Sequence, residues 1–219
     1  MLLDAPTLAA IALLAVGAAI VSGMSGFGAG VILTAALVPL IGPKAVLPVL
    51  SVAGIVINAG RFWFYRQHLD RRMLTLVLGV AVIASVPVRR VFHAKKMSLG
   101  RVGVATGSGV FGFAAGVASG AGVILVSLLL GAGLATPAVL ATDAMVSIIL
   151  DVCKAALFNR FDLLNADAFF TGAVIGLASI PGSAIAAWLV SRMGAKLHVL
   201  FMEILILFGG ASMLWHALR

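Results

Sequence analysis

The stretch Gly23-Met24-Ser25-Gly26-Phe27-Gly28-Ala29-Gly30 lies inside an apolar run that extends from about Thr7 to Ile41. Its four glycines weaken a helix, because each glycine costs on the order of 1 kcal/mol relative to alanine. As one helix the run would be about 50 Å long, more than a hydrocarbon core of ~30 Å. The sequence therefore predicts a tilted, broken helix, or a helix followed by a re-entrant segment, that ends at the turn Gly42-Pro43-Lys44.

The composition indicates a membrane protein. Of the 219 residues, 63% are hydrophobic and 10% are charged, whereas a soluble domain carries about 25% charged residues. Apolar runs of bilayer-spanning length recur along the chain. We therefore expect an all-α, polytopic transmembrane helical bundle that occupies residues 1–219 as a single integral membrane domain in the inner (plasma) membrane of the cell. The start of the chain does not resemble a cleaved signal peptide, because it has no basic segment.

The glycine-rich stretch has a second copy, Gly116-Val117-Ala118-Ser119-Gly120-Ala121-Gly122, and both copies continue with the same residues, Gly-Val-Ile-Leu. Further along, a constant offset of 93 residues aligns Asn58 with Asp151 and Arg61 with Lys154. These matches predict two homologous repeats with glycine-broken helices, over about residues 7–92 and 102–217.

About seven spans are expected from the lengths of the apolar runs. They cover residues 7–41, 45–65, 73–88, 102–134, 138–158, 166–190 and 198–217. The motif Ser179-Ile180-Pro181-Gly182 predicts a kink in the sixth. Segment 73–88 is short and has basic loops on both sides, one of them Arg66–Arg72, although basic loops favour the cytoplasm. Either the segment does not cross the membrane fully, or this half has lost a span, or the preference of basic loops for the cytoplasm does not hold here. With Arg66–Arg72 inside, the N-terminus is expected in the cytoplasm.

Away from their ends, the apolar segments contain five charged residues: Arg61, Asp143, Asp151, Lys154 and Glu203. Such groups are costly in a bilayer and usually face the protein interior or a water-filled path. Asp143, Ser147, Asp151 and Lys154 share one helical face, because they are spaced by four, four and three residues. Asp151 and Lys154 can therefore form an ion pair. The stripe fits either the lining of an anion path or a structural pair whose lysine reaches the interface.

Asn58 and Arg61 repeat this arrangement without a carboxylate. An arginine without an acidic partner suits an oxyanion, because its guanidinium presents several donors in a fixed fork. The alternative is an arginine that reaches the interface among the aromatic residues Phe62–Tyr65. Asp143 has no obvious partner in its own segment and is the first candidate for a carboxylate that carries a proton.

The two glycine-rich breaks are candidate parts of a substrate site. Their members are Ser25, Gly26 and Gly28 in the first copy and Ser119, Gly120 and Gly122 in the second. Hydroxyl groups, freed backbone N–H groups and helix N-termini can bind an anion there. The alternatives are helix packing through small residues and local hydrogen bonding of the serines.

No motif indicates an enzyme. The four histidines show no metal-ligand spacing, and neither a phosphate loop nor a Cys–His nucleophile pattern is present. We therefore expect no catalytic residues, no metal and no cofactor. The net charge of +8 comes from short basic loops, so it does not indicate nucleic-acid binding. The expected partners are a small anion and the lipid bilayer, with a homo-oligomer left open.

These motifs resemble the TauE/SafE family of membrane exporters of sulfite and organosulfur anions. The resemblance rests on the two glycine-rich copies, on Ala141-Thr142-Asp143-Ala144 and on Ser179-Ile180-Pro181-Gly182. It implies a helical permease with two repeats, usually of four spans each, that moves small sulfur-containing or carboxylate anions. The first repeat departs from this pattern, because segment 73–88 stands where the family typically has two spans.

The sequence thus predicts a transporter, an exporter or permease, of small anions such as sulfite, sulfonates or related organic acids. A pair of glycine-interrupted segments at matching places in two halves is the main indication. A non-transporting membrane subunit or a truncated permease homologue is the alternative, because the first repeat is short. A seven-helix retinal receptor is disfavoured, because the last apolar segment contains no lysine.

Overall fold

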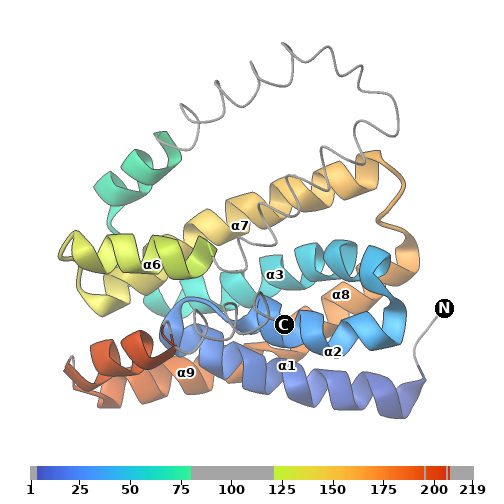
Figure 1. Ribbon diagram of the computed structural model, residues 1–219, viewed down its shortest axis with the longest axis horizontal. Helices are drawn as coiled ribbons and strands as arrows, with labels where there is room; N and C mark the ends of the chain where they lie inside the picture. The colour runs from blue at the N-terminus through green and yellow to red at the C-terminus, as the bar shows by residue number, and fades with distance from the viewer. Residues whose placement is uncertain (1–3, 80–120, 195, 206, 208–219) are drawn as a thin grey trace.

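The computed structural model describes residues 4–79, 121–194, 196–205 and 207, and within them it contains helices and no strand (Figure 1). The helices are α1 (Ala5–Ser25), α2 (Ala29–Ile41), α3 (Pro43–Tyr65), the 3₁₀ turn η1 (Arg66–His68), α6 (Ala121–Gly131), α7 (Thr136–Arg160), α8 (Ala166–Ala178) and α9 (Ile180–Arg192). Residues 71–79 and 196–205 are also helical. The predicted all-α class is confirmed for these residues.

The predicted break in the first apolar run is present. α1 ends at Ser25 and α2 begins at Ala29. Between them, Gly26 and Gly28 have left-handed φ angles of 87° and 105°, a conformation that glycine adopts without a steric penalty. The predicted turn after Ile41 is also present, where α2 stops at Gly42 and α3 begins at once.

α2 runs back along α1, because Ala10 near the start of α1 and Leu40 near the end of α2 line one groove. α3 then starts at the same end of the bundle as α1 and runs parallel to it (Figure 1). The start of α1 and the Arg66–Arg72 loop therefore lie at opposite ends of the bundle. The expectation that this loop and the N-terminus share one side did not count α2 as a segment that turns back, and the cytoplasmic placement of the N-terminus stays a prediction.

α3 is the central helix and contacts α2, α7, α8 and α9. α7 packs against it in the opposite direction, since Asp143 near the start of α7 meets Arg61 near the end of α3. α8 and α9 form one bent unit, and the bend lies at Ser179, where the Pro181 motif predicts a kink. The Ser179 hydroxyl donates a hydrogen bond to the carbonyl oxygen of Gly176 at 2.5 Å and caps the end of α8.

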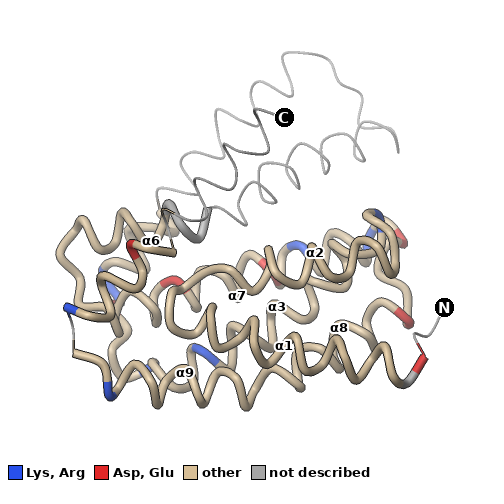
Figure 2. The backbone as a smooth tube through the Cα atoms, turned by 60° about the horizontal axis from the view of Figure 1, so that its bottom comes forward, with Lys and Arg blue, Asp and Glu red and all other residues tan. Residues whose placement is uncertain are grey.

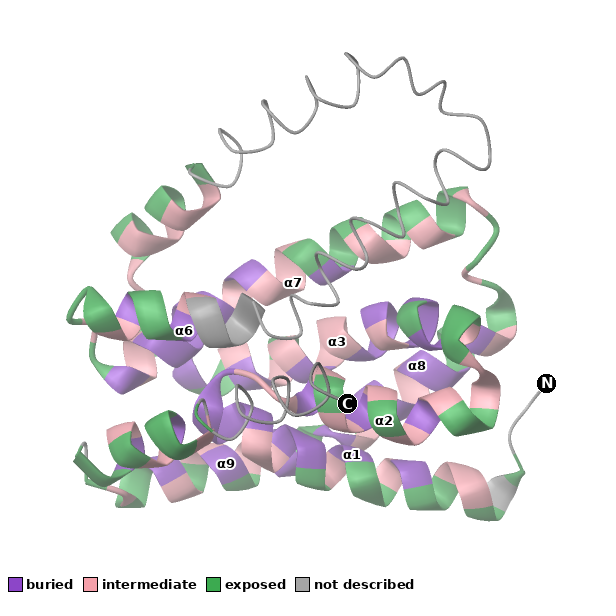
Figure 3. Cartoon of the chain, in the orientation of Figure 1, coloured by how far each residue is buried: buried purple, intermediate pink, exposed green. Residues whose placement is uncertain are grey.

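Within the described residues, three segments are long and apolar enough to cross a membrane: Pro6–Ser25, Pro43–His68 and Ala166–Arg192. Large apolar side chains lie exposed on their outer faces, as expected for contact with lipid, and Leu13 is 75% exposed (Figure 3). Charged residues gather towards the two ends of the bundle, with a smaller group between them (Figure 2). These features support a membrane protein. Seven spans and two repeats stay predictions, because segments 73–88, 102–134 and 198–217 lie partly outside the described residues.

Small residues let the helices approach closely. A Cβ atom added at Gly176 of α8 would lie 2.6 Å from Cβ of Val56 on α3, and one at Gly172 would lie 2.5 Å from the Val49 carbonyl oxygen. Helix packing through glycine, which the sequence left open for the breaks, is thus found in α8.

We predict that Gly176→Ala lowers stability by about 1–3 kcal/mol, because the methyl group overfills the α3–α8 contact. Gly17→Ala is the matched control, since no atom lies within 4 Å of an added Cβ there, and it should stabilise α1 by up to ~1 kcal/mol. Thermal unfolding of the purified protein in detergent measures both. Equal shifts of the midpoint in the two variants would contradict the close α3–α8 packing.

Candidate functional site

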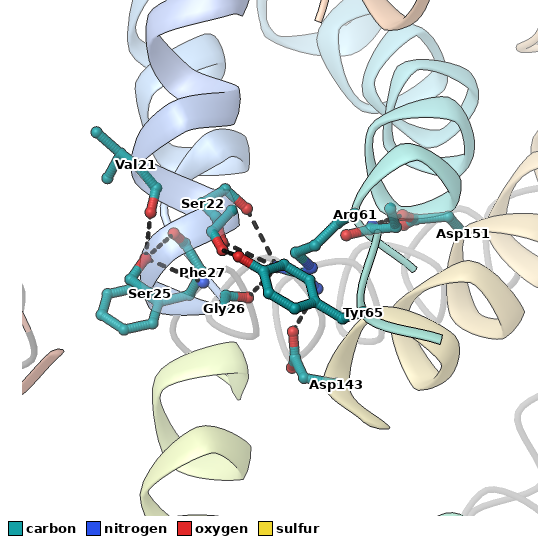
Figure 4. Close-up of polar contacts among 11 residues, drawn as sticks. Val21, Ser22, Ser25, Gly26, Phe27, Arg61, Tyr65, Asp143 and Asp151 are labelled. Carbon is teal, nitrogen blue, oxygen red and sulfur yellow. Dashed lines mark hydrogen bonds and ion pairs between the residues drawn. The ribbon is translucent and has the colours of Figure 1, made fainter. Parts of the chain in front are cut away.

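Arg61 lies near the end of α3 and is 2% exposed, and it is the largest of the fully buried side chains among the described residues. Its Nη1 donates to the carbonyl oxygen of Ser22 at 3.2 Å, to the Ser22 hydroxyl at 3.2 Å and to the Gly26 carbonyl oxygen at 2.6 Å. Its Nη2 forms an ion pair with Asp143 of α7 (Figure 4). The interpretations of Arg61 as an unpaired arginine and as an interfacial arginine are therefore both wrong.

The hydrogen bonds of Arg61 satisfy backbone carbonyl groups that the break leaves without partners at the end of α1. The last carbonyl groups of a helix have no partner within it, and they carry a partial negative charge. Two further side chains complete the set. The Tyr65 hydroxyl donates to the Gly23 carbonyl oxygen at 3.1 Å, and Nε2 of His198 lies 2.6 Å from the Met24 carbonyl oxygen. The α1 side of the break is thus a row of acceptors that a cation stabilises, and not a row of free N–H groups.

Ser25 is fully buried and uses its hydroxyl locally. Its O–H lies 2.7 Å from the carbonyl oxygens of both Val21 and Phe27, and its oxygen accepts from the Phe27 N–H at 3.3 Å. Local hydrogen bonding, one of the two interpretations left open by the sequence, accounts for all of these contacts.

Asp143 is 1% exposed, and its partner comes from another helix, where a search within its own segment could not find it. Gly26 lies beside it, since an added Cβ there would be 3.6 Å from Oδ2 of Asp143. Three buried polar atoms in these residues have no hydrogen-bond partner: Oδ1 of Asp143, Nε of Arg61 and Oγ1 of Thr142. The pair therefore keeps one free donor and one free acceptor inside the protein.

A second polar cluster lies further along α3 and α7. Nδ2 of Asn58 donates to Oδ2 of Asp151 at 3.0 Å, and Nζ of Lys154 donates to Oδ1 at 3.1 Å. The predicted Asp151–Lys154 ion pair is confirmed. A Cβ at Gly54 would overlap the Asp151 carboxylate, so this glycine makes the room that the carboxylate occupies. The Lys154 side chain is 29% exposed, and that of Asp151 is 12% exposed.

Sequence reasoning missed Ser22, Gly54, Tyr65 and His198. Gly54 carried a signal, because it lies one helical turn before Asn58 on the same face of α3. The other three carried none, since Ser22 accepts from the distant Arg61 side chain, and Tyr65 and His198 each bond to a backbone carbonyl of a distant segment. Ser119 and Gly120 lie outside the described residues, so the predicted meeting of the two breaks does too. Gly122 falls in the first turn of α6.

No group of His, Cys, Asp and Glu side chains that could hold a metal ion occurs within residues 4–79 and 121–207 as described. Glu203, the remaining ionisable residue of the apolar segments, is exposed. The groups available for binding are therefore the buried Arg61–Asp143 pair at the helix break and the partly accessible Asp151–Lys154 pair. Such groups bind and release ions and protons.

We predict that Arg61→Gln and Asp143→Asn each cost about 3–5 kcal/mol of stability, because each leaves a buried charge without its partner. The double variant should lose clearly less than the sum of the two, since residues in direct contact are not additive. Arg66→Gln serves as the control, because Arg66 stacks on the exposed Trp63 ring at 3.8 Å and should contribute about 1 kcal/mol or less. Thermal unfolding in detergent gives the four values, and additive losses would contradict the pairing.

Comparisons of the chain with protein-family models, with curated proteins and with solved structures found no match. The resemblance to the TauE/SafE family therefore stays a prediction from the motifs.

Proposed function

We propose that this chain is a multi-pass membrane transporter, an exporter or permease, for small anions such as sulfite, sulfonates or related organic acids. One observation carries the proposal: a fully buried arginine, Arg61, holds the open end of a broken helix inside an apolar bundle. In a membrane, broken helices occur where protein or a water-filled cavity covers the backbone. Buried ionisable groups there mark the paths of ions and substrates.

Arg61 is the residue that binds the anion. Its guanidinium already holds one carboxylate, that of Asp143, and its Nε has no partner among the described residues. A small oxyanion offers the same kind of acceptor oxygens as a carboxylate, and a guanidinium accepts either in its fork. The carbonyl groups of Ser22 and Gly26 share the same cation. They weaken its hold on an anion, which a transporter needs in order to release its substrate.

Two halves of opposite orientation supply the alternating access. α3 and α7 begin at Pro43 and Thr136 and run antiparallel, and their first residues differ by the same offset that aligns Asn58 with Asp151. This aligned pair forms a hydrogen bond. In two helices related by a two-fold axis, equivalent residues meet only near the axis. Inverted repeats with a site near such an axis are typical of secondary transporters.

We assign the end of the bundle with the Arg66–Arg72 loop to the cytoplasm, following the positive-inside rule. That end carries Arg66, Arg71, Arg72, Arg192 and Lys196 against Asp70, whereas the opposite end carries Asp4, Asp162 and Asp167 against Lys44 and Arg160. The start of α1 then lies on the outer side, opposite to the orientation expected from the sequence.

The test is anion flux into liposomes that contain the purified protein. We expect saturable uptake of labelled sulfite, of a sulfonate or of a small carboxylate. Arg61→Lys keeps the charge but loses the fork, and it should lower the rate at least about tenfold. Arg71→Lys is the matched control at an exposed position and should leave the rate unchanged.

A protein that unfolds cooperatively and yet moves none of these anions would contradict the proposal. That result would favour the alternative of a non-transporting membrane subunit.

A further inference from the structure

We propose that the Asp151 carboxylate is a proton-binding site and that its proton travels with the anion. The coupling step rests on the transport function proposed above. The assignment of the proton to Asp151, and not to Asp143, stands on the contacts of the two carboxylates.

Asp143 is unsuited to exchange a proton. Its carboxylate is 1% exposed and neutralises Arg61, and that same guanidinium bonds to the carbonyl groups of Ser22 and Gly26. A proton on Asp143 would leave the Arg61 charge inside the protein without its counter-ion, which is strongly destabilising. Asp143 therefore keeps its charge and fastens α7 to the break.

Asp151 has partners that tolerate its neutral form. Lys154 lies one turn away on the same helix and is 29% exposed, so water can solvate its ammonium group where it stands when Asp151 is neutralised. Asn58 is uncharged, and its amide can donate to a carboxylate or exchange hydrogen bonds with a carboxylic acid. The Asp151 side chain is itself 12% exposed, which gives a proton a way in and out.

The position of Asp151 links it to the anion site. It lies against Gly54 of α3, whose missing side chain leaves room for the carboxylate at the α3–α7 contact. The charged groups that act on it in the described part of the chain are Lys154 on α7 and the Arg61–Asp143 pair, with Arg61 on α3. A change of charge at Asp151 therefore alters the electrostatic environment of Arg61.

The charges of the two clusters explain why a proton would accompany the anion. Arg61 and Lys154 balance Asp143 and Asp151, so the interior is neutral when no substrate is bound. A bound monoanion would leave one uncompensated negative charge, which is costly inside a low-dielectric protein. One proton, added to the Asp151 carboxylate to give a carboxylic acid, restores neutrality. Loss of that proton on the other side releases the anion, so anion and proton move in the same direction.

The experiment compares two isosteric variants in liposomes, Asp151→Asn and Asp162→Asn, by uptake of labelled sulfite driven by a pH gradient. Asp151→Asn imitates the protonated acid, so gradient-driven accumulation should fall at least about tenfold while isotope exchange without a gradient stays measurable. Asp162 lies exposed in the loop before α8, and its variant should behave as the unchanged protein.

Accumulation that persists in Asp151→Asn would overturn the assignment, and so would an unchanged protein that exchanges sulfite but ignores the pH gradient. An unchanged protein that exchanges no anion would instead refute the proposed function. Infrared difference spectra between acidic and alkaline buffer then report on the site alone. A carboxylic-acid C=O band that is absent from Asp151→Asn and present in Asp162→Asn would support the proton site without transport, and identical spectra of the two variants would remove it.

Discussion

The carbonyl groups at the end of α1 need hydrogen-bond donors inside an apolar bundle, and this requirement organises the interior. Arg61 and Tyr65 supply donors from α3, and His198 supplies one from the C-terminal helix. The charge of Arg61 in turn requires a counter-ion, which Asp143 provides from α7. One interruption of a helix thus fixes the relative positions of four helices, because unsatisfied polar groups are costly where water is excluded.

The two polar clusters between α3 and α7 differ in access to water. The Arg61–Asp143 pair is almost fully buried and joined to the backbone of the break. The Asp151–Lys154 pair is partly exposed, and the uncharged amide of Asn58 donates to its carboxylate. A rigid pair beside an adaptable one is an arrangement in which one carboxylate holds the structure and the other is free to change its charge.

The features that follow from local sequence could be predicted. Glycines gave the break at Gly26–Gly28, Pro181 gave the bend near Ser179, and the spacing of Asp151 and Lys154 gave their ion pair. The Arg61–Asp143 pair could not be derived, because its members are 82 residues apart and meet only through helix packing. Both were nevertheless charged residues of apolar segments without a partner in their own segment, and a buried charge requires one. The position of the N-terminus relative to the Arg66–Arg72 loop could not be predicted for a similar reason, since the direction of α2 depends on its packing against α1.

The residues whose side chains donate to the carbonyl groups at the end of α1 are synthesised long after α1 itself. Those for Ser22 and Gly23 follow 39 and 42 residues later, and the one for Met24 follows 174 residues later. During synthesis the newly inserted α1 therefore exposes polar backbone that hydrocarbon cannot solvate. Its C-terminal end must stay in contact with water or with the insertion machinery until α3 arrives, and the Met24 carbonyl must do so until His198 has been synthesised. The hydrogen bonds at the end of α1 are therefore among the last to form as the chain folds.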